Sequence, residues 1–432
     1  MESPSIIKED LLHYVWKTRQ FDLSDLQLVD GRKLEILSFG HQNEDAGPDF
    51  SEATIIIDGI KWIGNVEMHT ISSMWKRHNH HLDSAYDNVI LHVVYEDDCP
   101  VIRKDGSIIP TLTLRDRIND SIHNNYSRLI SSEGWVPCES MIHQVDSSRV
   151  SLWLNQTGIS RLERKTGEIN ALLNQYNNDW EQICFILLCK YMGAKVNTLP
   201  MELMARQCDV KILSKNRDHL SGIEAILFGL SGMLQSPYKD EYPKKLITEF
   251  KFFQKKYNLN PINPVAWKFS RMRPSNFPTI RIAQIADMMT RSPFIFRRFI
   301  EAESIKEVVS LLNARASNYW DNHYRFDVES NIKKKQLSKS WIEMLIINVV
   351  APLLFIYGKS TFNLDLCDKA ISFMEDLPAE KNAIINKWQS LGVEVKNALQ
   401  SQGSLQLKQE YCSSHQCLSC SIGNQLIKGN RK

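Results

Sequence analysis

The stretch GPDFSEATIIIDGIKWIGNVEMH, residues 47–69, decides the fold of this chain. Residues 53–57 form an apolar and mostly β-branched run, which is typical of a strand. The dipeptide Asp58-Gly59 follows at once and is a strong signal for a tight hairpin turn. Residues 60–69 then supply a return strand. The stretch therefore predicts a β-hairpin in the first third of the chain.

Two carboxylates flank this hairpin. Asp49 precedes the first strand, and Glu67 lies on the second strand, two positions before His69. Because adjacent strands bring such residues to one sheet edge, we expect both carboxylates to bind Mg²⁺ or Mn²⁺ there. A site of this kind suits metal-assisted hydrolysis of phosphodiester bonds. In the alternative interpretation, Asp49 caps a turn and Glu67 faces solvent on an ordinary hairpin.

The rest of the first third has the patterns of one helix and several further strands. Apolar residues recur at helical spacing in residues 1–20. Strand patterns lie at residues 34–39, 89–95 and 108–114. From about residue 145 onward, long segments with a 3.6-residue period replace them. The chain is therefore predicted to be α+β, with the sheet in its N-terminal part.

This change of pattern also predicts the domain organisation. We expect an α/β domain with a mixed sheet over residues 1–140. A large all-α domain that carries the C-terminal cysteine cluster would follow over residues 141–432. The boundary would pass through the polar segment 115–134.

The composition is that of a soluble cytoplasmic protein. The chain has 432 residues, of which 43% are hydrophobic and 24% are charged, and its net charge is +2. Any nucleic-acid binding must therefore come from a local basic face. No secretory signal is recognisable at the N-terminus, and the odd number of cysteines favours a reducing compartment. The apolar segment 344–357 contains Pro352 and is short for a membrane span, so we expect a core helix and no membrane partner.

The hairpin and its polar residues resemble the PD-(D/E)XK nuclease superfamily. Pro48-Asp49 matches the first element of its motif, and Glu67-Met68-His69 lies where the superfamily has (D/E)-x-K. The resemblance implies a restriction-endonuclease-like domain and a Mg²⁺- or Mn²⁺-dependent nuclease that acts on nucleic acid. Asp49 and Glu67 would bind the metal, and Glu9 would be the helix carboxylate that many members have.

His69 departs from the superfamily pattern, because a histidine is only partly charged near neutral pH. It would assist the attacking water or the scissile phosphate in place of the lysine. Gln42 or His92 would complete the site. The alternative is a non-catalytic module on a degenerate nuclease fold, which binds nucleic acid or protein.

Histidines gather close to these carboxylates in the sequence. Six of the 12 histidines lie between residues 41 and 92, among them His78, His80 and His92. Their spacing matches no established zinc signature. Either three of them form a zinc site or they belong to a solvated loop. His92 lies within an apolar strand, where it is either a core residue or part of a cleft.

Three cysteines near the C-terminus have the spacing of a metal site. They are Cys412, Cys417 and Cys420, and Cys138 is the predicted fourth ligand, with His415 as the next candidate. Such a set holds zinc or a 4Fe–4S cluster, unless the thiols are simply reduced and packed. The pattern resembles that of iron–sulfur nucleases, in which, however, the upstream cysteine precedes the nuclease motif.

A segment of the helical region interleaves basic and aromatic residues. Arg271, Arg273 and Arg281 lie in it and are candidates for contact with a nucleic-acid backbone. The prolines of this segment favour a second interpretation, in which the arginines hold carbonyl groups in a buried loop.

Several strings together are similar to an uncharacterised bacterial family that is defined as a domain of unknown function. They are AGPDF at 46–50, GNVEMH at 64–69, YDNVILHVVYEDD at 86–98, RMRPSNFPTIRIAQ at 271–284, NVVAPLLFIYG at 348–358 and EYCSSHQCLSCSIG at 410–423. The resemblance covers nearly the full length. It implies that the helical region and the cysteine tail belong with the α/β head.

Overall fold

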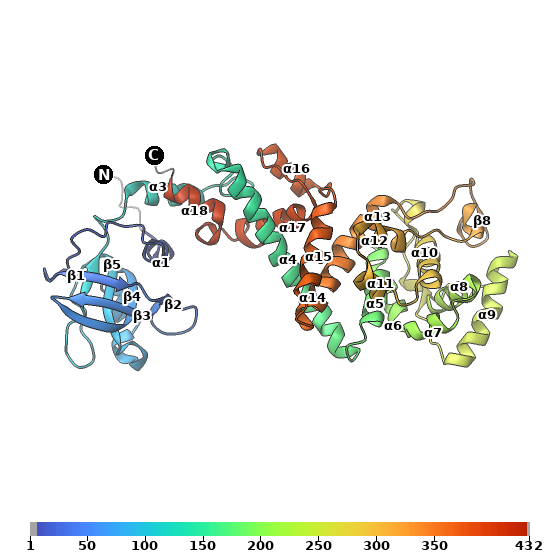
Figure 1. Ribbon diagram of the computed structural model, residues 1–432, viewed down its shortest axis with the longest axis horizontal. Helices are drawn as coiled ribbons and strands as arrows, with labels where there is room; N and C mark the ends of the chain where they lie inside the picture. The colour runs from blue at the N-terminus through green and yellow to red at the C-terminus, as the bar shows by residue number, and fades with distance from the viewer. Residues whose placement is uncertain (1–6, 430–432) are drawn as a thin grey trace. The chain divides into compact units, whose positions relative to one another are not determined.

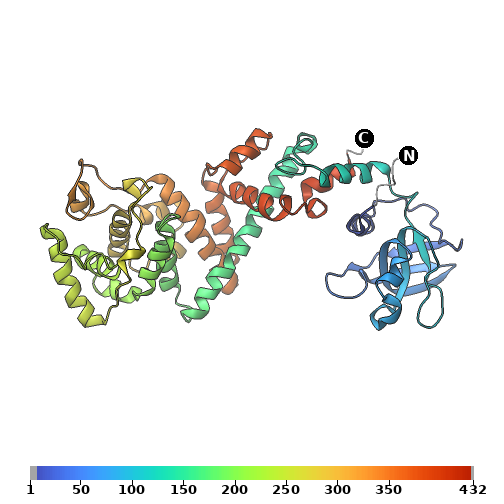
Figure 2. The same cartoon turned by 180° about the vertical axis from the view of Figure 1, so that it is seen from behind.

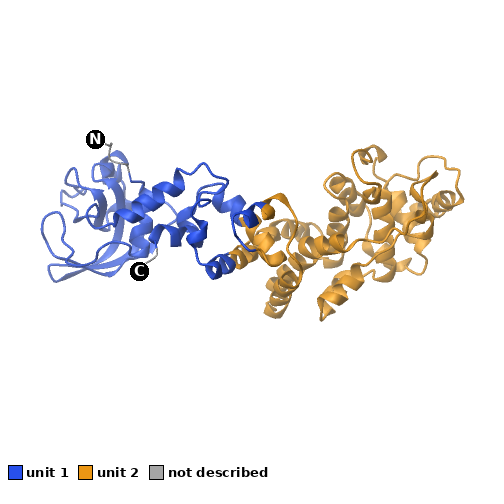
Figure 3. Ribbon diagram, turned by 90° about the horizontal axis from the view of Figure 1, so that it is seen from above, with its two compact units in different colours: residues 1–153, 387–394, 407–432 blue, residues 154–386, 395–406 orange. Residues whose placement is uncertain are grey.

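The computed structural model describes residues 7–429, and these form an α+β protein (Figure 1). The chain divides into two compact units, which Figure 3 colours. Unit 1 comprises Met1–Trp153, Lys387–Glu394 and Leu407–Lys432, and unit 2 comprises Leu154–Asn386 and Val395–Gln406. This division differs from the predicted one at residues 140 and 141. The C-terminal segment with its cysteines belongs to the unit that holds the sheet.

Unit 1 contains a mixed six-stranded sheet with the order β1-β3-β4-β5-β6, in which β2 also pairs with β3. The pairs β1–β3, β2–β3 and β3–β4 are antiparallel, whereas β4–β5 and β5–β6 are parallel. The strands are β1 (Leu34–Ser38), β2 (His41–Gln42), β3 (Phe50–Ile57), β4 (Ile60–Ile71), β5 (Val89–Glu96) and β6 (Thr111–Thr113). The turn between β3 and β4 is the predicted Asp58-Gly59.

The crossover from β4 to β5 is short and made of small helical turns. They are α2 (Met74–Arg77), η1 (His80–Leu82) and η2 (Ser84–Tyr86). Helix α1 (Glu9–Thr18) packs on β4, and its Trp16 side chain lies against Phe21, Phe39 and Phe50. The apolar spacing of the first residues thus produces the predicted helix over its described part, while residues 1–6 lie outside the described residues.

The remaining elements of unit 1 come from both ends of the chain. Helix α3 (Asp120–Ile130) lies within the polar segment that was predicted as a boundary, and Asn119 caps its start. Figures 1 and 2 show α3 beside α18 (Ser421–Lys428). Two 3₁₀ turns, η3 (Ile142–Gln144) and η9 (Cys417–Ser419), and a π-helical stretch, η8 (Leu407–Cys412), complete this part.

Unit 2 is almost entirely helical. Helices α4 (Ser147–Gln175) and α16 (Ala383–Ser390) each have residues in both units. The helices that lie wholly in unit 2 are α5 (Trp180–Met192), α6 (Thr198–Arg206), α7 (Val210–Lys215), α8 (Leu220–Leu230), α9 (Glu241–Tyr257), α10 (Pro278–Arg291), α11 (Ile295–Glu301), α12 (Ile305–Leu312), α13 (Lys339–Leu345), α14 (Ala351–Ser360), α15 (Leu364–Asp376) and α17 (Ala398–Gln406). Shorter elements are η4 (Pro264–Ala266), η5 (Pro274–Asn276), η6 (Asn318–Asp321), β7 (His323–Arg325) and β8 (Val328–Glu329).

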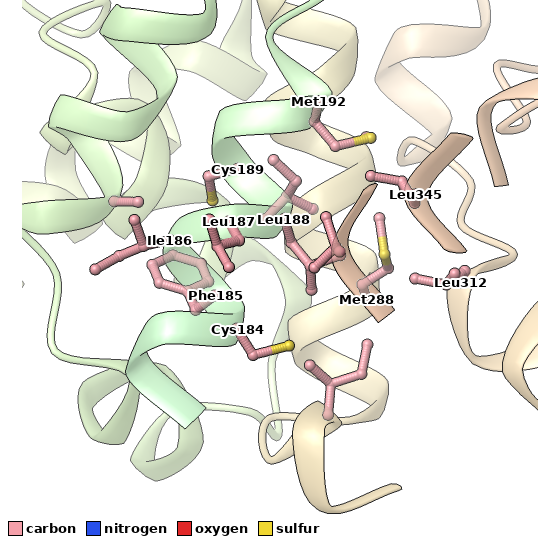
Figure 4. Close-up of a cluster of buried hydrophobic side chains, with 14 of the residues drawn as sticks. Cys184, Phe185, Ile186, Leu187, Leu188, Cys189, Met192, Met288, Leu312 and Leu345 are labelled. Atoms are coloured by element: carbon pink, nitrogen blue, oxygen red, sulfur yellow. The ribbon is translucent and has the colours of Figure 1, made fainter. Parts of the chain in front are cut away.

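The core of unit 2 is built around α5. Figure 4 shows Phe185, Leu188 and Met192 of this helix among Met288, Leu312 and Leu345 from α10, α12 and α13. Cys184 and Cys189 of α5 are also fully buried, as core thiols that behave like small apolar side chains.

The apolar segment around Pro352 is a core helix with a local irregularity. Helices α13 and α14 are joined by one π-helical stretch, η7 (Ile346–Val350), immediately before the proline. Proline lacks the N–H that would bond to Asn348, and a wider turn accommodates its ring. The helix Lys339–Ser360 is long and apolar enough to cross a membrane, yet 72% of its most apolar 18-residue window is buried. Packing of this kind is that of a core helix.

Candidate functional site

Asp49 and Glu67 converge at the end of the hairpin. The backbone N–H of Asp49 donates to Oε2 of Glu67 at 3.2 Å. The backbone N–H of Met68 donates to Oδ2 of Asp49 at 2.8 Å. Each carboxylate is therefore held by the backbone next to the other one. Glu67 is 4% exposed, so the interpretation in which it faces solvent does not fit.

A β-bulge helps to bring these groups together. The register of β3 against β4 shifts between Phe50 and Ala53, and Glu52 takes a left-handed backbone conformation with φ of 57°. A bulge adds one residue to a strand and bends it locally. Here it lies directly after Asp49, opposite the part of β4 that carries Glu67.

Helix α1 contributes a third carboxylate and a histidine. Nε2 of His13 lies 3.2 Å from Oδ2 of Asp49 and 3.9 Å from Oε1 of Glu9. Glu9, His13 and Asp49 together offer three ligand atoms within 4.8 Å of one another. The side chains of Glu9 and His13 meet because they are four residues apart on one helix. Glu9 was predicted for this place, whereas His13 was not, although its spacing from Glu9 was a readable signal.

On the other side of Glu67 lies a cluster of histidines. Nδ1 of His69 is 2.9 Å from Nε2 of His92, and Nε2 of His69 is 3.1 Å from Nδ1 of His78. Nε2 of His80 lies 3.1 Å from Oε1 of Glu67. His69, His78 and His80 form the second group whose ligand atoms all lie within 4.8 Å. The histidine-rich crossover therefore folds onto the site.

The sheet explains why these residues meet. Glu67 and His69 are two apart on β4, so their side chains point to the same face. His92 is the parallel partner of Glu67 on β5. The ring of Tyr86 stacks on that of His80 with a centroid distance of 3.9 Å and fixes the crossover above this face. Tyr86 had no predicted role in the site.

Burial controls the charge of these groups. It raises the pKa of Glu67 above its ordinary value, an effect that the neighbouring imidazole of His80 opposes and the Asp49 charge reinforces. Burial also lowers the pKa of His69 to about 2, and the neighbouring His92 and His80 add to the effect. The pKa of His92 falls to about 3, again mainly through burial. Both imidazoles are therefore neutral near pH 7, and His69 cannot supply the permanent positive charge of a lysine.

A cleft opens beside this site within unit 1. One wall is α1, and the opposite wall is the cysteine loop, which we define as residues 412–420. The lining residues are Asp10, His13, Tyr14, Lys17, Gln42, Tyr126, Ser414, His415, Gln416, Leu418 and Ser419. Gln42 accepts a hydrogen bond from Nζ of Lys17 at 2.9 Å. The predicted residue Gln42 thus lies in this cleft and not among the metal-ligand atoms.

The four predicted cysteines converge on one cavity. Cys138, Cys412, Cys417 and Cys420 line it together, and each is 7% exposed. Burial, reinforced by neighbouring thiols, raises the pKa of Cys138 to about 12, and burial with Cys420 nearby does the same for Cys417. His415 instead lines the cleft. The fold thus brings together the three closely spaced thiols and Cys138, the predicted fourth ligand, although Cys138 lies far from the others along the chain.

The predicted nucleic-acid contacts in unit 2 do not form one surface. Arg281 is only 3% exposed, and its guanidinium donates to Gln284 at 2.8 Å and to Asn276 at 2.7 Å. It also lies 3.8 Å from the ring centroid of Trp341. Arg281 therefore holds a buried segment together, as the second interpretation of this segment had it. Arg271 and Arg273 are exposed.

A family model for proteins of unknown function, DUF2851, matches residues 9–383, and the chain belongs to this family. No curated protein and no solved structure gives a significant match. The match covers the sheet, the histidine cluster, Cys138 and most of unit 2.

Proposed function

We propose that this member of DUF2851 is a metal-dependent nuclease of the PD-(D/E)XK type, which hydrolyses phosphodiester bonds in nucleic acid. The observation that carries the proposal is the reciprocal pair of hydrogen bonds, from Asp49 N–H to Glu67 and from Met68 N–H to Asp49. These bonds fix two carboxylates side by side at the end of the hairpin, where a divalent cation would find oxygen ligands.

The order of elements supports the same proposal. Helix α1 precedes an antiparallel unit of β1, β3 and β4, and a crossover then leads to β5, which is parallel to β4. The superfamily resemblance implies this order, with a helix carboxylate on the first helix. Glu9 of α1 lies beside Asp49 in the manner that the resemblance requires. The crossover helix α2 is only four residues long, which is shorter than the resemblance implies.

The residues of the site suit hydrolysis of a phosphodiester. One water is consumed, a new P–O bond forms, and the bond from phosphorus to the departing oxygen breaks. A bound cation would lower the pKa of the attacking water and stabilise charge on the departing oxygen. Asp49 and Glu67 would hold this cation with Glu9 completing its shell, and the proton of the water would pass to solvent. His69, being neutral, would hold or orient groups through its ring nitrogens and would not neutralise the phosphate.

The cleft beside α1 offers a path for a nucleic-acid strand. Lys17 and His415 face this cleft from its two walls, and His13 connects it with the carboxylates. Phosphate groups would meet the ammonium group of Lys17. The proposal therefore places substrate contact in unit 1. The sequence had instead indicated Arg271, Arg273 and Arg281, which lie in unit 2.

The test is cleavage of single- and double-stranded DNA and RNA with Mg²⁺ or Mn²⁺, beside Asp49→Asn and Glu67→Gln. Glu35→Gln is the matched control, because this carboxylate is exposed on β1 of the same sheet. We expect a loss of at least about 100-fold in both site variants and none in the control. Equal activity of all four proteins would assign the cleavage to a contaminant.

A second candidate function is a non-catalytic binding module on the same fold. The neutral state of His69, in the place of a lysine, favours it. In that case the purified protein binds a nucleic acid without cleaving it, and Lys17→Ala weakens binding while Asp49→Asn leaves it unchanged.

We also propose that the four thiols hold a 4Fe–4S cluster as a structural centre of unit 1. Four thiolates on one zinc ion lie about 3.8 Å apart, because each Zn–S bond is about 2.3 Å long. Within residues 7–429, the groups with three ligand atoms inside 4.8 Å are the two described above, and the thiols do not form a third. An iron–sulfur cluster holds its thiolates farther apart, since iron and sulfide lie between them.

The cluster is tested by iron and acid-labile sulfide analysis of protein purified without oxygen. We expect about four of each per chain, with loss in Cys420→Ser and no loss in Cys99→Ser, which lies outside the cavity. One zinc per chain and no sulfide would assign zinc to the site instead.

A further inference from the structure

We propose that His69, His78 and His80, with Glu67, form a second metal position that prefers an ion of the zinc class to Mg²⁺. The candidate centre would then hold two ions, one on each side of Glu67. This inference rests on the proposed function for its chemistry, but ion binding itself can be measured without any substrate.

The spacing of the nitrogen and oxygen atoms fits one ion. Two neighbouring ligand atoms bonded to the same ion at about 2.0–2.1 Å lie about 2.8–3.4 Å apart in octahedral or tetrahedral geometry. Nε2 of His69 is 3.1 Å from Nδ1 of His78. Oε1 of Glu67 is 3.1 Å from Nε2 of His80 and 3.7 Å from Nε2 of His69. All of these separations lie close to that range.

The contact between His80 and Glu67 lacks the geometry of a hydrogen bond. Nε2 of His80 is buried and has no hydrogen-bond partner, although Oε1 of Glu67 lies 3.1 Å away. A buried polar atom without a partner is costly, and such atoms call for an explanation. Two ligands that point at a common ion, and not at each other, give this combination of short distance and poor hydrogen-bond geometry.

The surroundings of His69 fit a metal ligand. A histidine that binds metal through one ring nitrogen usually donates its other N–H to a fixed acceptor. Nδ1 of His69 lies 2.9 Å from Nε2 of the fully buried His92. His92 can accept this proton and leave Nε2 of His69 free for an ion. His69 is thus used as a ligand where the superfamily places a charged lysine.

The two positions differ in their ligand chemistry. Glu9, His13 and Asp49 offer mainly carboxylates, which suit Mn²⁺ and Mg²⁺. His69, His78 and His80 offer three imidazoles, which suit zinc and its neighbours among the transition metals. Glu67 lies between them, since Oε2 accepts from Asp49 N–H and Oε1 faces His80. The centre would therefore hold two ions of different preference.

The test uses the full chain, stripped with a chelator, and the thiol site is the same in every variant, so that it contributes equally to each titration. Zn²⁺ binding is measured by calorimetry, and Co²⁺ serves as a visible-absorption probe of tetrahedral coordination. His80→Ala and His78→Ala change residues of the partly exposed crossover, and His41→Ala, exposed on β2, is the control. We expect Zn²⁺ affinity to fall at least tenfold in both crossover variants and to be unchanged in the control.

The outcomes separate this inference from the nuclease proposal. Zn²⁺ binding that is lost in His80→Ala supports the second position, whether or not the protein cleaves nucleic acid. Zn²⁺ binding that is equal in all variants overturns it, even if Asp49→Asn abolishes cleavage. In that case His92, His69 and His78 form a hydrogen-bonded chain only.

Discussion

The imidazole of His92 has no exposed surface, and it touches His69 through two ring nitrogens that are 2.9 Å apart. Burial keeps it neutral, with a pKa of about 3. A neutral imidazole can accept a hydrogen bond on one nitrogen, and this fixes which nitrogen of His69 carries the proton. His92 is thus a positioning residue, whose role depends on an acceptor atom and not on charge.

This role predicts different effects for two substitutions of His92. His92→Leu removes the acceptor, and Zn²⁺ affinity should fall about 10–100-fold, as it does when outer partners of metal ligands are lost. His92→Gln keeps an acceptor oxygen and should recover most of the affinity. Calorimetry measures both, and melting temperatures show whether either variant is simply unfolded. Equal loss in the two variants would assign His92 to packing alone.

Glu224 of unit 2 is a buried acid that should make stability depend on pH. Its carboxyl is 1% exposed, and burial, only partly opposed by hydrogen bonds to Ser317 and Tyr242, raises its pKa to about 7. Between its ordinary value of 4.5 and about 7, the folded state keeps a proton that the unfolded chain has lost. The free energy of unfolding therefore decreases as pH rises through this window and levels off above it.

Glu224→Gln should remove this dependence. At pH 8 we expect the variant to be more stable than the parent by about 2–3 kcal/mol, with little difference at pH 4.5. Denaturant titrations at the two pH values measure this. The exposed Glu303→Gln is the control and should show no such change. A parent protein whose stability is flat from pH 5 to 7 would contradict the assignment.

The residues of the site were predictable to different degrees. Asp49 and Glu67 could be found because Asp49 lies just before the first strand of a recognisable hairpin and Glu67 lies on its second strand. His13 was missed, since its partner Asp49 is distant in sequence and only the helix–sheet packing brings the two together. Arg281 looked like a phosphate contact because composition alone does not show that its side chain is enclosed by Trp341 and Gln284.

At the scale of elements, the start of α18 holds the cysteine loop in a close approach. A Cβ atom on Gly423 would lie 2.2 Å from the carbonyl oxygen of Cys417, which is far inside van der Waals contact. Because the obstructing atom belongs to the backbone, the loop itself would have to move. Any methyl group at this position should therefore open the four-thiol cavity without changing a thiol.

Gly423→Ala should accordingly reduce the metal content of the thiol site at least tenfold and lower the melting temperature. Gly167→Ala is the matched control, since a Cβ there meets nothing within 4 Å in helix α4, and it should be neutral or stabilising by about 0.5–1 kcal/mol. Metal analysis and thermal unfolding measure both variants. Full metal content in Gly423→Ala would show that the loop tolerates the shift.

Helices and turns were predicted correctly where the local sequence pattern was strong. The Asp58-Gly59 turn and the helical character of the chain after about residue 145 were predicted correctly, because turn chemistry and the 3.6-residue period are local properties. Helix α3 was missed because it is mostly polar and buries only Ile122, Tyr126 and Leu129. That narrow apolar face is packed against α18, an element from the other end of the chain.

At the scale of the molecule, unit 1 is completed by residues from the C-terminal part. The indole ring of Trp135 contacts that of Trp388, with centroids 5.1 Å apart, and the backbone oxygen of Trp135 accepts from Nζ of Lys408 at 2.7 Å. Asn125 donates to the backbone of Ile427 at 3.4 Å. No feature of the sequence marks such a return, since it is a property of tertiary contacts. This explains why the predicted division at residue 140 differs from the observed units.

A fragment of residues 1–153 should therefore be much less stable than the same unit in the full chain. Without residues 387–394 and 407–432, the apolar face of α3 and the indole ring of Trp135 lose their packing partners. Three of the four thiols are also missing. We expect a lower melting temperature and aggregation in size-exclusion chromatography. The same fragment joined by a short linker to residues 407–432 should recover much of the loss. A fragment that is as stable as the full protein would contradict this account.

The distance between Cys138 and Cys412 along the chain also determines how long after Cys138 the ribosome makes Cys412. A ribosome that adds about 5–20 residues per second reaches Cys412 roughly 15–55 s after Cys138 has been made. During this interval Asp49, Glu67 and the histidines are already present, but the opposite wall of the cleft has not been synthesised. The four-thiol cavity likewise closes only once residues 412–420 have emerged. A translation product interrupted before Cys412 would thus carry the acidic pair without the wall that faces it.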